Sequence, residues 1–306
     1  MLNLLLYYAL RVAERVLPLL PLRAVYALAA GAGTLAYYLV GPARRGIRSN
    51  LSVAFPDHSG VWYGRTARSA FQHDAKNWAD TLRIARMSDE DIRDSLKLHG
   101  WEHLDVALKK KRGVILLTVH LGNFDLVGQV IAGHGLSLTV PVGRIQPAQL
   151  FDFLLARRAS KGIHLVPVEL APRAMIAALR RGEIVGIAAD RVVTGKTIKV
   201  QFFGRPTPFP RGIASLARHT GAPVLVGIGL RRPGGRFEGF VSGPVRLGSE
   251  APVLQDEAAI LQQIAAAAEE CIREAPDQWM AFTPIWPENL GGMVPATIDQ
   301  HIEAAV

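Results

Sequence analysis

The sequence contains only one cysteine, and this scarcity excludes two kinds of site. Cys271 lies inside an alanine-rich stretch that is typical of a helix, where a lone thiol has no partner for an intrachain disulfide. It also rules out a cysteine-based metal site, so we interpret Cys271 as a small packed hydrophobic residue. The nine histidines show no paired spacing typical of metal ligands, and the sequence therefore predicts no metal site.

Several catalytic and nucleotide-binding motifs are also missing. The chain has no Gly-x-Ser-x-Gly elbow, which argues against a serine hydrolase. The "GKT" at 195–197 does not complete a phosphate-binding loop, because Asp190 stands where that motif needs a glycine. The "GAGTLA" at 31–36 follows an alanine-rich helical run and not a strand, so it is no dinucleotide turn. Internal repeats and low-complexity tracts are absent as well.

Charged residues are sparse, at 20%, while hydrophobic residues reach 49%, a balance that predicts contact with a bilayer without predicting a multi-span protein. Residues 1–21 are apolar on most sides, but Arg11, Glu14 and Arg15 interrupt them, so we expect an amphipathic helix. This segment lacks the cationic start and small-residue cleavage site of a secretory signal peptide.

Residues 24–42 carry no charge and precede the cationic stretch "GPARRGIR". Their length is marginal for crossing a bilayer, and Gly31 and Gly33 permit close helix packing. Three interpretations stay open: one spanning helix, a helical pair embedded in one leaflet, or two buried core helices.

Positive charge is in excess, with a net charge of +9, and this favours anionic partners. The basic run at 109–112, "KKKR", lacks the interleaved aromatic residues typical of nucleic-acid binding. We therefore expect anionic lipid headgroups, or the phosphates or acidic carrier of a substrate, and no nucleic acid.

The chain beyond about residue 108 alternates short apolar runs with helical patterns, which is typical of an α/β fold. Residues 52–102 are helical and charged in pattern. The predicted strands are 114–119, 137–142, 163–168, 184–189, 198–203, 223–230 and 236–242. The predicted helices between and after them are 126–132, 147–161, 172–181, 212–220 and 253–274. Several strands are apolar on both faces, which indicates a mostly parallel, buried sheet. An aromatic, proline-rich tail at 275–290 is expected to pack back on the core.

A histidine ends the first strong strand, in "VILLTVHLGNFDLVG" at 114–128. Ligands of open α/β sheets bind at the carboxyl ends of strands, so His120 is favourably placed. On one regular helix His120 and Asp125 would lie about 140° apart. Gly122 permits a bend, and Asn123 is a strong N-cap for a helix that begins at Phe124.

In that geometry Asp125 falls in the first helical turn and is able to accept a hydrogen bond from His120 Nδ1. Nε2 is then free to take a proton from a hydroxyl group. No protein nucleophile is evident, so the natural reaction is direct attack by a substrate hydroxyl on an activated acyl group. The alternative is a capping aspartate beside a structural histidine.

Four blocks of the sequence together resemble one family. "HLGNFD" is similar to the His-x4-Asp/Glu block of glycerolipid acyltransferases, in the form found in bacterial lipid A and phosphatidylinositol mannoside acyltransferases. "ARRGIRSNLSVAFPD", at 43–57, resembles the family's N-terminal basic stretch. "AADRVVTGKTIKVQFFGRPTPFPRGIASLARHTGAPVLV", at 188–226, resembles its acidic turn, Phe-Phe-Gly hairpin and following strand. "DQWMAFTPIW", at 277–286, also matches, and the resemblance covers nearly the whole chain.

The resemblance implies a layered α/β/α acyltransferase domain over 46–306, behind membrane-associating helices at 1–45. It implies a protein on the cytoplasmic face of the inner (plasma) membrane that moves a fatty acyl group to a glycolipid or phospholipid hydroxyl. The acyl donor would be acyl-CoA or acyl carrier protein, used as a substrate, with no further cofactor. Two features resemble the phosphatidylinositol mannoside acyltransferases more than the lipid A acyltransferases. They are the aspartate, in place of glutamate, at the end of "HLGNFD" and the "FTPIW" ending.

The family's functional positions carry over onto named residues. His120 and Asp125 match the dyad, and Asp190 matches an acidic residue near the site that would orient the acceptor or assist the histidine. Its alternative role is a turn aspartate that ends a strand. Arg144, and either Arg157 or Arg158, match arginines suited to phosphate recognition, with solvated helix surface as the alternative.

Two further positions are predicted to contact substrate. Asn123 is a candidate donor to a developing oxyanion, although capping ranks higher for it. Arg211, in "FPRGIAS", stands where glycerol-3-phosphate and lysophosphatidate acyltransferases have a glutamate, which disfavours a simple glycerophospholipid acceptor. Two alternative functions stay open. The protein is an acyltransferase that acts on lysophosphatidate or another glycerophospholipid, or it is a non-catalytic protein that binds anionic membranes.

Overall fold

The computed structural model describes residues 2–84, 87–143, 148–159, 162–192, 195–243, 245 and 256–286, which fall into two compact units. The helical unit comprises Met1–Arg86, Ile145–Arg157 and Ala275–Val306, and the sheet unit comprises Met87–Arg144 and Arg158–Glu274. The predicted division after residue 45 separated membrane-associating helices from the acyltransferase domain. That division stays a prediction.

The sheet unit is built on one mixed sheet. Within the described ranges its strand order is β1-β9-β8-β2-β5-β3-β4. The bounds are β1 Leu96–His99, β2 Val114–Thr118, β3 Leu138–Val142, β4 Ile163–Pro167, β5 Ile184–Ala188, β8 Val224–Arg231 and β9 Phe237–Val241. β8 and β9 pair antiparallel, and every other pairing in this sheet is parallel. The predicted α/β class with a mostly parallel sheet is confirmed.

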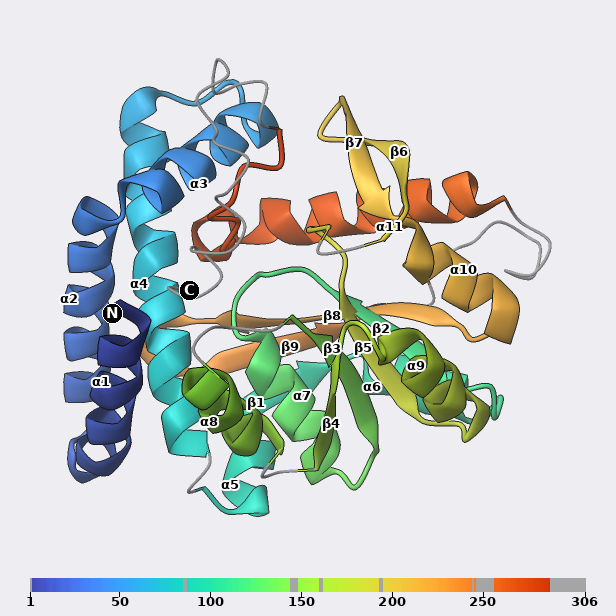
Figure 1. The fold of residues 1–306 in the computed structure, drawn as a ribbon, viewed down its shortest axis with the longest axis horizontal. Coiled ribbons are helices and arrows are strands. Elements are labelled where there is room, and N and C mark those ends of the chain that lie inside the picture. The colour runs from blue at the N-terminus through green and yellow to red at the C-terminus, as the bar shows by residue number, and fades with distance from the viewer. Residues whose placement is uncertain are drawn as a thin grey trace. The chain divides into compact units, whose positions relative to one another are not determined.

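Helices cover both faces of this sheet (Figure 1). They are α5 (Asp89–Asp94), α6 (Trp101–Leu108), α7 (Phe124–Gly133), α9 (Ala171–Arg180), α10 (Arg211–Thr220) and α11 (Glu257–Glu274). Gly229 of β8 faces α7, because a Cβ there would lie 2.6 Å from Val127. Ile228, which points the opposite way along the strand, lines a cavity with Ala267 of α11. α7 and α11 therefore lie on opposite faces.

Two strands were not predicted from residue pattern. β1 lies in a region predicted to be helical, but Leu96 and Leu98 alternate with polar residues, and the strand pairs with β9 at the sheet edge. β7 (Arg205–Pro210) carries proline at every second position and pairs with β6 (Thr197–Phe202) in the hairpin that the family resemblance implied. Prolines spaced by two leave the N–H groups on the other side of the strand able to pair.

The helical unit contains α1 (Leu2–Val16), η1 (Leu17–Leu19), α2 (Leu22–Leu39), α3 (Gly41–Ala54), α4 (Gly60–Ile84), η4 (Pro276–Gln278) and most of α8 (Ala148–Ala159). α2 lies against α4 so closely that a Cβ on Gly33 would stand 2.4 Å from the carbonyl oxygen of Phe71. The Tyr26 hydroxyl donates to Asp80 Oδ1 at 2.8 Å across the same pair of helices. Only a glycine permits this approach.

The C-terminal aromatic segment packs onto α3. Asn50 Nδ2 donates to the carbonyl oxygens of Ala281 and Thr283, both at 2.8 Å, and Asn50 Oδ1 accepts from Ile285 N at 2.8 Å. Trp279 and Trp286 are buried in consequence. The prediction that this tail returns to the core is confirmed for its described part, and it packs on helices from the opposite end of the chain.

Among the described residues, no single helix is both long and apolar enough to cross a bilayer. α2 and α3 meet the length and composition criteria only when taken together, and the chain bends by 92° between them.

Cys271 lies in α11, where its surroundings make the thiol unreactive. Burial, and secondarily the negative charge of Glu270, raise the pKa of its thiol to about 11. The thiolate is the nucleophilic form of cysteine, so this thiol is almost wholly protonated at neutral pH. That property agrees with a packing role.

Candidate active site

His120 lies just beyond the carboxyl end of β2, at the centre of the sheet. β2 pairs with β5 on one side and β8 on the other, and Ala189 N donates to Thr118 O at 2.9 Å where β2 and β5 end. This bond brings the residue after Ala189 next to His120. The predicted position of His120, at the carboxyl end of a buried strand, is confirmed.

Asp190 is the hydrogen-bond partner of His120. The distance from His120 Nδ1 to Asp190 Oδ1 is 2.7 Å, and the His120 backbone N–H lies 3.1 Å from each carboxylate oxygen. The Asp190 side chain is 2% exposed, whereas that of His120 is 21% exposed. An almost fully buried carboxylate thus holds a histidine that still reaches solvent.

This contact determines which ring nitrogen carries the proton. A carboxylate only accepts hydrogen bonds, so Nδ1 must donate, and neutral imidazole then leaves the Nε2 lone pair available. The expectation that Asp125 accepts the Nδ1 bond was wrong, because Asp190 occupies that place. Of the two roles predicted for Asp190, its contact fits assistance to the histidine.

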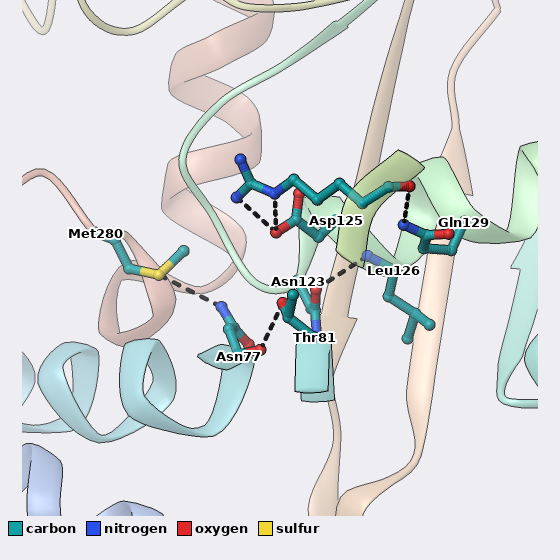
Figure 2. A network of polar contacts seen from close by, with 8 residues as sticks. Asn77, Thr81, Asn123, Asp125, Leu126, Gln129 and Met280 are labelled. Atoms are coloured by element: carbon teal, nitrogen blue, oxygen red, sulfur yellow. Dashed lines mark hydrogen bonds and ion pairs between the residues drawn. The ribbon is translucent and has the colours of Figure 1, made fainter. Parts of the chain in front are cut away.

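The bend after His120 is anchored to β8. Gly122 has φ +62° and forms an isolated bridge with Gly229, and Asn123 N donates to Gly229 O at 2.7 Å. Asn123 is 1% exposed, and its Oδ1 accepts from Leu126 N at 3.0 Å (Figure 2). The predicted N-cap and the helix start at Phe124 are confirmed. The oxyanion role of Asn123 stays a prediction.

Gly122→Ala is expected to destabilise the protein by at least about 2 kcal/mol and to remove activity. A Cβ at this position would lie 2.0 Å from Gly229 O, and the residue would also keep a left-handed conformation. Chemical denaturation gives the free energy of unfolding, and an acyl-transfer assay gives the activity.

Gly135→Ala is the matched control for this prediction. Gly135 has φ +77°, and a Cβ there would meet no heavy atom within 4 Å, so this change isolates backbone strain from steric conflict. A Gly122 variant no less stable than the Gly135 variant would contradict the close approach to β8.

Asp125 is paired with Arg158. Arg158 Nη2 and Nε lie 2.8 Å and 3.1 Å from Asp125 Oδ2, and the Arg158 and Asp125 side chains are 25% and 20% exposed. One turn further along α7, Gln129 Nε2 donates to the Arg158 carbonyl oxygen at 3.2 Å. Figure 2 shows Asp125 and Gln129 directed to the same neighbouring segment. Asp125 therefore holds Arg158 and does not orient the histidine.

Truncating Asp125 or Arg158 to alanine is expected to lower the free energy of unfolding by about 1–3 kcal/mol each. The double variant should cost scarcely more than either single variant, because both changes remove the same pair. Thermal and chemical denaturation of the four proteins measure the coupling. Arg181, whose partner Glu183 is close to it on an exposed surface, is the control: Arg181→Ala should change stability little.

Arg157 and Arg211 have partners other than Asp125. Arg157 Nε is bonded to Glu14 Oε1 within the helical unit, whereas Arg158 belongs to the sheet unit. Arg211 Nε is bonded to Glu257 Oε2, and this partner raises the pKa of the guanidinium. Arg144 lies outside the described residues. Substrate contacts of these arginines stay predictions.

Two residues with contacts to the predicted site residues were not identified from the sequence. The Phe124 ring lies edge-on to His120, with 5.5 Å between ring centroids. Gln129 holds the Arg158 backbone, and its only sequence signal is its position four residues after Asp125 on one helix face.

Comparison with known proteins identifies the family. The model of the bacterial lipid A biosynthesis acyltransferase family matches residues 1–288. The chain belongs to this family. Its members are named acyltransferases, so the protein is an acyltransferase, and the alternative of a non-catalytic binding protein is set aside.

Individual relatives carry two different names. The phosphatidylinositol mannoside acyltransferase of Mycobacterium tuberculosis strain H37Rv is 30% identical over 221 residues, covering 70% of this chain and 67% of the relative. That of Mycolicibacterium smegmatis is 28% identical and covers 52% of this chain and 53% of its own. The lipid A biosynthesis lauroyltransferase of Escherichia coli K12 is 26% identical, covering 85% and 84%.

Proposed function

We propose that the protein transfers a fatty acyl group from a thioester donor to a hydroxyl group of a glycolipid, with His120 as the general base. The observation that carries this proposal is the 2.7 Å contact between His120 Nδ1 and Asp190, at the carboxyl end of the central strand of a family acyltransferase. Because this contact occupies Nδ1, the other ring nitrogen, Nε2, is available to the substrate.

The reaction proceeds by direct attack. His120 Nε2 removes the proton of the acceptor hydroxyl while its oxygen forms a bond to the thioester carbonyl carbon. The tetrahedral intermediate then breaks its carbon–sulfur bond. The departing thiolate takes the proton from the imidazolium, so the products are an ester and a free thiol.

Asp190 stabilises the charge that this cycle places on the imidazole. Its carboxylate is buried and also accepts the His120 backbone N–H, so it stays fixed as the ring becomes cationic. α7 begins four residues after His120, and the positive end of its dipole favours the developing oxyanion.

The acceptor in this proposal is a phosphatidylinositol mannoside-like or lipid A-like glycolipid, and the donor is acyl-CoA or acyl carrier protein. The relatives' names support this class of acceptor. A glycolipid with long acyl chains resides in a bilayer, so the protein would act at a membrane surface, on the cytoplasmic face of the inner membrane. The net charge of +9 suits such an anionic surface.

The test uses purified protein, radiolabelled acyl-CoA or acyl carrier protein, and a total lipid extract from the host. The proposal expects label in a glycolipid, identified by mass spectrometry, with release of one thiol per ester formed. Label in phosphatidate, the product of acylating lysophosphatidate, or in another glycerophospholipid would instead support the alternative acceptor. Label on the protein itself, before acceptor is added, would overturn direct attack.

A further inference from the structure

We propose that a cavity between α11 and the strands β8, β9 and β1 binds an uncharged, single-chain lipid whose head donates a hydrogen bond. The cavity has a volume of about 720 Å³, within the range of about 300–1,000 Å³ that is typical of small-molecule sites. All of its lining residues belong to the sheet unit, and none belongs to the segments 114–125 and 184–191 that carry His120 and Asp190. The site is additional to the proposed active site, and the inference does not depend on the proposed reaction.

The floor of the cavity is a row of side chains on one face of the sheet. Ile228 of β8 is the register partner of Phe240 in β9, and Phe240 is the partner of His99 in β1. Register partners stand side by side on the same face. The His99 and Phe240 rings stack, with 5.1 Å between centroids and 13° between planes. Val226, two residues before Ile228, extends this apolar and aromatic floor.

The roof of the cavity is one side of α11. Its lining residues recur at the helical spacing of three and four positions: Gln263, Ala266, Ala267, Glu270 and Cys271. The two alanines are the central members of this set, and their short side chains leave the space above the floor unfilled. Protein interiors are otherwise packed closely, so this space has room for a guest. Ala266 and Glu270 are exposed, and the cavity is therefore open to solvent beside them.

The side-chain amide of Gln263 provides the polar end of the site. Gln263 Oε1 is buried and has no hydrogen-bond partner among the described residues. Nearly all buried polar atoms in folded proteins are paired, so such an atom indicates a donor from outside the chain. The hydroxyl group of Ser242, by contrast, already accepts from Val226 N at 3.1 Å and donates to Gly243 O at 2.9 Å. Because the last torsion of a glutamine side chain is soft, a rotation is enough to present the amide to a guest.

The charge of the lining disfavours an anionic guest. Its described residues include the carboxylate of Glu270 but no lysine or arginine. Burial, and secondarily Glu270, raise the pKa of the neighbouring Cys271 thiol to about 11, so both oppose a negative charge at this place. A carboxylate or phosphate bound in the cavity would meet the same two effects. Fatty acids and the phosphates of an acyl donor are therefore disfavoured.

These features define the class of ligand. An alkyl chain matches the apolar floor, and a hydroxyl group is able to donate to the Gln263 amide without bringing a negative charge near Glu270. The ligand is accordingly an uncharged lipid with one alkyl chain and a hydroxyl head, such as a long-chain alcohol or a monoacylglycerol. It differs in charge from the acyl donor of the proposed reaction.

The test uses a photoreactive analogue of 1-decanol that carries a diazirine in its alkyl chain. The purified full chain is irradiated with this probe at about pH 8, and mass spectrometry locates the cross-links, which are expected in α11 or β9. 1-Decanol should compete at least about 10-fold more effectively than decanoate, which has the same chain length but is ionised at this pH. 1-Decanoylglycerol is the second uncharged competitor, and the tighter of the two identifies the head group.

Variants of the lining test the two ends of the site. Ala267→Phe fills the cavity and should reduce cross-linking of α11 and β9 by at least about 10-fold. Ala177→Phe, at an exposed alanine of α9 outside the lining, is the matched control and should be labelled as wild type is. Gln263→Leu keeps the apolar contacts but removes the hydrogen bond, so 1-decanol should compete about 3- to 10-fold less well. His120→Ala should bind the probe as wild type does, which separates this site from the proposed reaction.

Three results would overturn the proposal. They are cross-links confined to other elements, decanoate competing as well as 1-decanol does, and unchanged labelling of an Ala267→Phe protein whose thermal transition shows that it is folded.

A second measurement covers an Ala267→Phe protein that does not fold. Cys271 lines the cavity and is the only cysteine of the chain, so its reaction with methyl methanethiosulfonate at about pH 9 reports access to the cavity in the wild type. Saturating 1-decanol should slow this reaction by at least about fivefold, and the same concentration of decanoate should not. An unchanged rate with 1-decanol would contradict the site.

Discussion

His120→Ala is expected to reduce kcat/KM for acyl transfer by at least about 10³-fold. A positioned general base contributes about 10²–10⁴-fold, and here the same imidazole also returns the proton to the leaving thiolate. Its side chain is 21% exposed, and Asp190 keeps the backbone N–H bond from residue 120 in the variant, so the fold should tolerate the removal. The measurement is release of thiol and formation of labelled ester at several acceptor concentrations.

His219→Ala is the matched control, because His219 is an exposed histidine in the last turn of α10. It should retain wild-type activity. Near-normal turnover by His120→Ala, with an unchanged thermal transition, would contradict the assignment of the base.

Asp190→Asn is expected to reduce kcat by about 10²–10⁴-fold while leaving the donor KM changed by less than about threefold. An amide lacks the negative charge that stabilises the imidazolium, and its NH₂ group is able to favour the wrong tautomer of the histidine. Its oxygen still accepts the His120 backbone N–H, so the fold should hold. Steady-state kinetics and a thermal melt separate these effects.

Asp125→Asn serves as the comparison for Asp190→Asn. It keeps an acceptor for Arg158 and does not touch Nδ1, so it should lower kcat much less than Asp190→Asn does. The opposite order would mean that Asp125, and not Asp190, assists the histidine during the reaction.

Most of the sheet could be predicted because buried parallel strands consist of continuous runs of apolar residues. β2 and β8 are apolar on both faces, and their predicted ranges agree with the structure to within a residue at each end. The short edge strand β1 lacks that signal, because its four residues alternate and sit among helical patterns. The proline-rich strand β7 resembles a loop by residue type, and only the family resemblance indicated its hairpin.

The position of His120 could be predicted, but its partner could not. Asp125 is near His120 in sequence, whereas Asp190 lies 70 residues away and reaches it only because β5 pairs with β2. The residue pattern of a single strand does not reveal which strands will be its neighbours in a parallel sheet. Asp125 instead lies one turn before Gln129 on the face of α7 that meets Arg158, a contact that likewise depends on tertiary packing.

The most direct test of the central claim is the activity of the double variant His120→Ala with Asp190→Asn. If Asp190 acts through His120, the aspartate change costs nothing further once the imidazole is gone, and the double variant should have the same kcat/KM as His120→Ala alone. A double variant slower than His120→Ala by the full factor that Asp190→Asn causes in the wild-type background would contradict the claim.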